Sequence, residues 1–176
     1  MSVVDVDAVL VTLERTPSAL RAMLTGLPAE LVHVTEGGES WSPFDIVGHL
    51  IHGERTDWIP RLQIILTEGR AEFERFDRFA QFEASQGSSV EGLLDEFETL
   101  RAANLDTLRE MLAEGIDVDA EGTHPELGLV TTGELLSTWA THDLGHIAQA
   151  ARVMAKHFGK DAGPWAAYLP ILRDRS

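Results

Sequence analysis

Residues 131–154, TTGELLSTWATHDLGHIAQAARVM, indicate a long amphipathic helix whose first turn carries a capping box. The Thr131 side chain can accept from the backbone of Glu134, and the Glu134 side chain can reach back to the start of the helix. Apolar residues then recur at the spacing of one helix face: Leu135, Trp139, Ile147, Ala150 and Met154. This spacing predicts a helix with one face directed into a protein core.

Two earlier stretches show the same periodicity, and each contains a proline. The first spans residues 10–27, where Pro17 predicts either a kink or a restart of the helix with Thr16 as its cap. The second spans residues 42–65 and opens with Ser-Pro-Phe-Asp, which fits a capping box with proline at the first helical position. Within this second stretch, Pro60 predicts a kink.

The remaining helical stretch, residues 90–112, carries the broadest apolar stripe and lies between a start at Ser89 and a stop at Gly115. Strand signals are weak, and residues 127–130 are the one candidate for a short extended piece. Four long amphipathic helices without a sheet to cover predict an all-α four-helix bundle. The length of 176 residues fits one domain, residues 1–176.

Two further segments connect to this bundle. Residues 68–88, between the second and third helical stretches, hold four phenylalanines at a spacing of three: Phe73, Phe76, Phe79 and Phe82. A connection this long and apolar is expected to pack on the bundle as a helical lid or loop. A short C-terminal segment around residues 164–170 is expected to fold back across one end of the bundle.

The net charge of the chain argues against some classes of binding partner. It has 14 Lys and Arg against 29 Asp and Glu, a formal net charge of −15, which disfavours binding to nucleic acid or to an anionic membrane. The first residues carry acids where a signal peptide carries Lys or Arg. No apolar run approaches the roughly 20 residues that a membrane helix needs. We therefore expect a cytoplasmic protein that acts on a small-molecule substrate.

Histidines are the candidate functional groups, because the chain has seven of them and no cysteine. Without cysteine, disulfides, thiolate nucleophiles and thiolate metal ligands are excluded. His142 and His146 are four positions apart, which places both imidazoles on one helix face where they can share a metal ion. The alternative is a buried pair satisfied by hydrogen bonds. A third ligand could come from His49 or His52, and the pattern favours His49 because it lies at the edge of the apolar face.

Two motifs resemble the DinB/YfiT-like superfamily of metal-binding four-helix proteins. Residues 41–50, WSPFDIVGHL, are similar to its first signature, and residues 124–128, HPELG, followed by Trp139 and residues 142–147, HDLGHI, are similar to its second. The resemblance covers nearly the whole chain. It implies that His49, His142 and His146 coordinate one divalent metal ion, and that a homodimer is expected.

The resemblance also suggests a class of activity, because some members of this superfamily use a low-molecular-weight thiol such as bacillithiol or mycothiol. Three imidazoles leave at least one open position on the metal, which is typical of a reactive site. We therefore expect a metal-dependent enzyme that activates a small-molecule thiol for transfer to an electrophilic substrate. Two alternatives stay open: a hydrolase with a metal-bound water, and a non-catalytic metal-binding or interaction protein. Imidazole suits Zn, Ni and Fe alike, and no catalytic base is identified.

Overall fold

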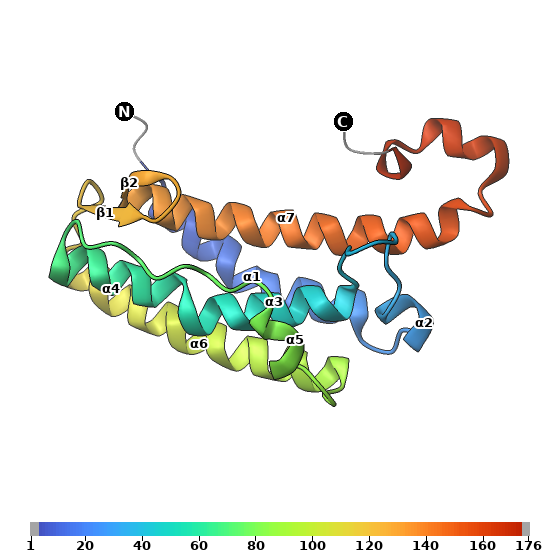
Figure 1. Cartoon of the computed structure of the whole chain (residues 1–176), viewed down its shortest axis with the longest axis horizontal. Coiled ribbons are helices and arrows are strands. Elements are labelled where there is room, and N and C mark those ends of the chain that lie inside the picture. Colours follow the sequence, from blue (N-terminus) through green and yellow to red (C-terminus); the bar gives the residue numbers. More distant parts are fainter. Residues whose placement is uncertain (1–3, 174–176) are drawn as a thin grey trace.

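The structure is a computed structural model that describes residues 4–173, and it confirms the all-α four-helix bundle (Figure 1). The long helices are α1 (Val6–Leu24), α3 (Pro43–Thr56) continued by α4 (Trp58–Glu68), α6 (Val90–Glu114) and α7 (Thr132–Gly159). The short elements are α2 (Ala29–Val32), α5 (Ala80–Ala84), β1 (Glu121–His124), β2 (Gly128–Thr131), and the 3-10 helices η1 (Gly163–Tyr168) and η2 (Pro170–Leu172).

Helix α1 continues through Pro17, so the predicted restart at Thr16 is wrong. Thr16 lies inside the helix, and its hydroxyl donates to a carbonyl of the preceding turn. Because Pro17 has no N–H, the Leu13 carbonyl one turn earlier loses its helical donor. Nη1 of Arg101, on α6, donates to that carbonyl at 2.9 Å. A side chain from another helix therefore replaces the hydrogen bond that proline removes.

The second helical stretch starts as predicted and is interrupted near the predicted place. Ser42 and Asp45 form both hydrogen bonds of the capping box at the start of α3. The kink expected at Pro60 is a break at Asp57, which separates α3 from α4. Pro60 cannot donate to the carbonyl of Thr56, so the regular hydrogen-bond ladder stops there. The Asp57 side chain consequently lies at the junction of the two helices.

The segment between α4 and α6 is a helical lid only in part, because residues 69–79 contain no helix and α5 is a single short helix. Phe73 is buried at 3% exposure, whereas Phe79 and Phe82 are 55% and 43% exposed. The Phe73 N–H donates to the Thr123 carbonyl at 2.9 Å. The extended part of this segment is therefore attached to β1.

A β-hairpin covers one end of the bundle, and sequence patterning predicted only its second strand. Strand β1 pairs antiparallel with β2, with Glu121 opposite Thr131 and His124 opposite Gly128. Strand β2 contains most of the predicted extended piece and leads directly into α7. Thr131 and Glu134 form both hydrogen bonds of the predicted capping box there.

The core is divided into two apolar clusters, one toward the hairpin and one toward α2 and α5. Leu13, Trp58, Leu108 and Trp139 belong to the first cluster. Leu20, Leu50, Phe97 and Ala150 belong to the second. Helices α1, α6 and α7 thus contribute to both clusters, whereas α4 contributes only to the first and α3 only to the second. Polar residues occupy the positions between the clusters.

Arg101 is at the centre of this polar layer. Its Nη2 lies 2.7 Å from Oε1 of Glu54 on α3, and its Nη1 lies 2.5 Å from Oδ2 of Asp143 on α7. The three side chains are at most 1% exposed. Asn104 and Trp139 also donate to the Glu54 carboxylate, at 2.9 and 3.2 Å. The Arg101 network, meaning these five side chains, connects three helices of the bundle and, through Leu13, the fourth.

The C-terminal segment packs on the end of α7, whereas it was expected to fold back across one end of the bundle. A Cβ atom built on Gly159 would lie 2.7 Å from Leu172 of η2, so the two elements are in close contact. Trp165 and Tyr168 of η1 remain 75% and 80% exposed. Across residues 4–173, no helix combines the length and the apolar character needed to cross a membrane.

Replacement of Arg101 by methionine is expected to lower the free energy of unfolding by about 3–5 kcal/mol, because two buried carboxylates lose their counter-charge. The matched control is Arg109→Met on the same helix, where the ion pairs with Glu14 and Asp106 are exposed. That change should cost about 1 kcal/mol or less. Urea denaturation of the three proteins measures both values, and similar losses in the two variants would contradict a special role for Arg101.

Candidate metal centre

Three histidines from two helices meet at one point in the bundle. Nε2 of His142 lies 3.0 Å from Nε2 of His49 and 3.1 Å from Nε2 of His146. One nitrogen from each ring lies within 4.8 Å of the others. No other group of three or more potential ligands this close was found in residues 4–173. The structure therefore brings together the three residues named from the sequence.

Local structure explains how the three rings converge. His142 and His146 are one turn apart on α7, so their side chains share a face. His49 belongs to the buried face of α3. His52, the other candidate on that helix, is not in the cluster, and its ring lies 4.8 Å from that of Phe76. Of the two candidates on α3, His49 is thus the one that lies next to His142 and His146.

Aromatic rings surround the cluster. Trp41 lies 4.7 Å from His49 and 6.1 Å from His146, measured between ring centroids. Phe76 meets His49 edge-on at 5.5 Å, and Trp58 meets His142 edge-on at 5.1 Å. These rings exclude water from the sides of the cluster. The imidazoles are consequently held in an apolar environment.

This environment keeps the imidazoles neutral. Burial, with repulsion from His146 and His52, lowers the pKa of His49 from 6.5 to about 3. Burial, with repulsion from His146, His49 and Arg101, lowers the pKa of His142 to about 2. Burial also lowers the pKa of His146, although its hydrogen bond to Gln149 and the charge of Asp143 oppose the change. Neutral imidazoles are the form that binds a metal ion.

The hydrogen-bonding capacity of the rings shows how well they fit a metal. Nδ1 of His146 lies 2.9 Å from Oε1 of Gln149 and donates to it, so Nε2 of His146 carries a lone pair. Nε2 of His142 faces the Nε2 atoms of both other rings, yet it can offer only one hydrogen or one lone pair. Hydrogen bonds therefore cannot satisfy all three rings. Nitrogens that share one ion at about 2.1 Å lie about 3.0–3.4 Å apart, and the separations of His142 from His49 and from His146 are in this range.

The acids near the histidines have other roles. Asp143, which directly follows His142 in sequence, pairs with Arg101. Glu54 is ion-paired with Arg101 and fully buried. Neither carboxylate is available as a ligand in this arrangement.

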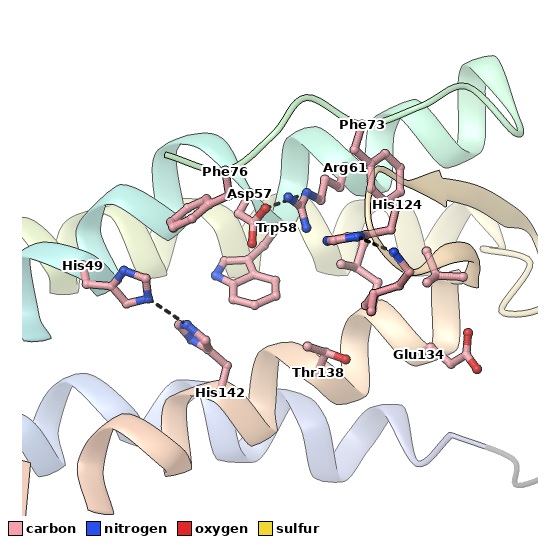
Figure 2. A pocket seen from close by; sticks show the side chains of 14 residues that line it. His49, Asp57, Trp58, Arg61, Phe73, Phe76, His124, Glu134, Thr138 and His142 are labelled. Atoms are coloured by element: carbon pink, nitrogen blue, oxygen red, sulfur yellow. Dashed lines mark hydrogen bonds and ion pairs between the residues drawn. The ribbon is translucent and has the colours of Figure 1, made fainter. Parts of the chain in front are cut away.

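A cavity of about 290 Å³ extends from His49 and His142 along α7 toward the hairpin (Figure 2). Its walls are largely apolar and include Trp58, Phe73 and Leu135. Openings of this kind next to potential metal ligands are typical of small-molecule sites. The histidine cluster can therefore be reached through this cavity, on the side of His49 and His142.

Sequence patterning missed two arginines of this region. Arg101 interrupts the apolar stripe of α6 four residues after Phe97 and four before Leu105, and a charge at such a position signals a buried partner. Arg61 lines the cavity and forms an ion pair with Asp57. Asp57 and Arg61 are four residues apart in an otherwise apolar stretch, and this spacing is the sequence signal for their ion pair.

Comparison with known proteins gives the family. The chain is similar in structure to YfiT from Bacillus subtilis, with a TM-score of 0.76 and 20% identity over 89% of this chain and 90% of that one. YfiT is described as "a probable metal-dependent hydrolase with an unusual four-helix bundle topology". No curated protein sequence matches the chain significantly. Residues 12–150 match the family model of the DinB superfamily, which covers most of the chain, and this protein therefore belongs to the DinB superfamily.

Proposed function

We propose that this protein is a metal-dependent enzyme that holds one divalent ion on His49, His142 and His146 and acts on a small molecule bound in the adjoining cavity. The observation that carries the proposal is the meeting of three neutral imidazoles at one end of that cavity. Three protein ligands leave a position for a reactant, whereas structural sites are usually closed by four.

The chemistry follows from the donor set. A divalent ion bound by three imidazoles supplies Lewis acidity, which lowers the pKa of a water or thiol bound to it. The protein residues supply position and a dry environment. His49 and His142 face the cavity, and Trp58 and Phe76 limit the access of water to them.

The carboxylates that line the cavity are already engaged. Asp57 pairs with Arg61, and Glu134 accepts from the Thr131 backbone N–H. Both carboxylates of the described lining residues therefore already have a partner in the protein. We infer that activation of the nucleophile depends on the ion rather than on a side-chain base.

The nucleophile distinguishes two candidate reactions. The similarity to YfiT, described as a probable metal-dependent hydrolase, favours water and hence hydrolysis. The alternative is transfer of a low-molecular-weight thiol to an electrophile. Since the chain contains no cysteine, that thiol would have to enter the cavity as a second substrate. A non-catalytic metal-binding role requires the same three ligands but predicts no turnover.

Untagged protein is expected to contain one divalent ion per chain by elemental analysis. His49→Ala, His142→Ala and His146→Ala should each weaken metal binding by more than about 100-fold, because loss of the partner of a ligand alone costs about 10–100-fold. His52→Ala is the matched control, since His52 lies on the same helix as His49 but outside the cluster. Metal binding that survives all three cluster substitutions would contradict the site.

Activity is tested on the same proteins with a panel of esters and amides, and separately with thiols and electrophiles. Hydrolysis without thiol supports the hydrolase, whereas turnover only with thiol supports transfer. Either activity should disappear on chelation and return with added metal, and should be retained in His52→Ala. A metal-loaded protein with neither activity over both panels would favour the non-catalytic alternative.

The stability of the metal-free protein is expected to fall as the pH drops below about 6.5. The unfolded chain takes up protons on His49 and His142 there, while in the folded protein their pKa values are only about 3 and 2. At pH 5 each ring should cost roughly 2 kcal/mol of unfolding free energy. Urea denaturation at pH 7 and pH 5 measures this loss. It should be about 2 kcal/mol smaller in His142→Gln, and an equal loss in both proteins would contradict the neutral state of the ring.

A further inference from the structure

The end of the cavity farthest from the histidine cluster is polar, unlike its middle. Arg61 and His124 lie toward that end, between α4 and the hairpin, and Asp57 lies between Arg61 and the histidine cluster (Figure 2). Along α7, the lining residues extend from His142 to Glu134, a distance of about 12 Å for eight helical residues. An occupant of the whole cavity thus has one end near the histidines and the other near these polar groups.

The guanidinium of Arg61 is held in one orientation. Its Nε lies 2.6 Å from Oδ1 of Asp57, and the group lies over the Phe73 ring, 5.3 Å from its centroid. The side chain is only 11% exposed. In residues 4–173 no other hydrogen-bond or ion-pair partner of this guanidinium is found. Its Nη1 and Nη2 edge therefore remains available, and that edge can bind a carboxylate through two hydrogen bonds.

His124 supplies a second donor beside Arg61. Nδ1 of His124 accepts from the backbone N–H groups of Glu126 and Leu127, at 3.1 and 3.2 Å. A neutral imidazole then carries its hydrogen on Nε2. Burial, followed by repulsion from Arg61, lowers the pKa of His124, which favours this neutral form. In Figure 2 the remaining nitrogen of the ring lies toward the Arg61 guanidinium.

The nearby acids do not occupy these donors. Asp57 uses the Nε side of Arg61, and Glu134 accepts from the Thr131 N–H in the capping box. Figure 2 shows the Glu134 side chain directed away from Arg61 and His124. Two donor groups, one on the buried Arg61 and one on the half-buried His124, therefore lie close together without an acceptor shared between them. Such a pair of donors can bind a hydrogen-bond acceptor on a ligand in the cavity.

We propose that the substrate is a carboxylic acid with an apolar body, whose carboxylate binds Arg61 and His124 while its reactive end lies at the histidine cluster. The apolar walls formed by Trp58, Phe73 and Leu135 fit an aryl or alkyl chain. The assignment of this ligand as substrate rests on the function proposed above. The anion site itself depends only on the cavity.

The test is a calorimetric titration of 4-phenylbutanoate and, as the uncharged analogue, 4-phenylbutanamide. Both are titrated into the full-length protein after chelation, so that the carboxylate cannot bind an ion in the histidine cluster. The acid is expected to bind at least 10-fold more tightly than the amide, as a charge-assisted pair requires.

Variants locate the site of binding. Arg61→Lys keeps a positive charge beside Asp57 but lacks the Nη1 and Nη2 edge of the guanidinium. It should weaken acid binding about 10-fold. Asp57→Asn with Arg61→Met removes both charges without leaving a buried carboxylate unpaired, and should bring the acid to the affinity of the amide.

His124→Asn keeps an acceptor for the hairpin N–H groups but removes the Nε2 donor, and should weaken acid binding about 5-fold. The control Arg70→Met changes an exposed arginine that pairs with Glu121 of the same hairpin, and should leave both affinities unchanged.

Two results would overturn the proposal: equal binding of acid and amide to the unaltered protein, or acid binding that is unaffected in the double variant. Neither result depends on metal content or turnover. Failure of the metal and activity experiments therefore refutes the enzymatic role while leaving the anion site standing, and failure of this titration refutes the anion site alone.

Discussion

The guanidinium of Arg101 is the constraint on which the rest of the bundle depends. It is buried with two carboxylates, Glu54 and Asp143, and with the Leu13 carbonyl that Pro17 leaves without a donor. Buried ion pairs add little stability relative to apolar packing, but a buried charge without its partner is strongly unfavourable. The four helices are therefore compatible with only those offsets along the bundle axis at which these groups meet.

This constraint reaches the histidine cluster through short lengths of helix. Asp143 directly follows His142 on α7, and Glu54 is five residues after His49 on α3. Because Arg101 fixes the positions of the two carboxylates along the bundle axis, it also fixes the level on that axis at which His49 faces His142 and His146. Trp139 extends the connection, because it donates to Glu54 and stacks on Trp58, whose edge meets His142. The site is thus built on rigid elements rather than on loops, which suits a metal centre.

Sequence patterning predicted the features that depend on neighbours within one helix. The capping boxes at Ser42 and Thr131 involve residues three apart, and His142 and His146 are one turn apart, so local spacing is sufficient for both. His49 is different, because its place in the cluster depends on how two helices pack. The helical pattern alone favours His49 over His52, and the resemblance to the DinB/YfiT-like motifs singles it out.

The features that were missed depend on contacts between distant segments. Pro17 is tolerated inside α1 because Arg101 replaces the lost hydrogen bond from another helix. Strand β1 has no alternating pattern of its own and forms by pairing with β2. The Phe73–Phe82 series divides because only its first part lies against the hairpin, where Phe73 bonds to Thr123. None of these partners can be identified from the spacing of residues along the chain.

The central claim is that His49, His142 and His146 share one ion, and X-ray absorption spectroscopy of the metal-loaded protein tests it most directly. The account predicts three nitrogen ligands at about 2.0–2.1 Å with the multiple scattering of imidazole rings, together with one or more lighter exchangeable ligands. A shell of oxygen atoms without imidazole scattering would contradict it, since that would place the ion on the acidic surface of the protein instead of the histidine cluster.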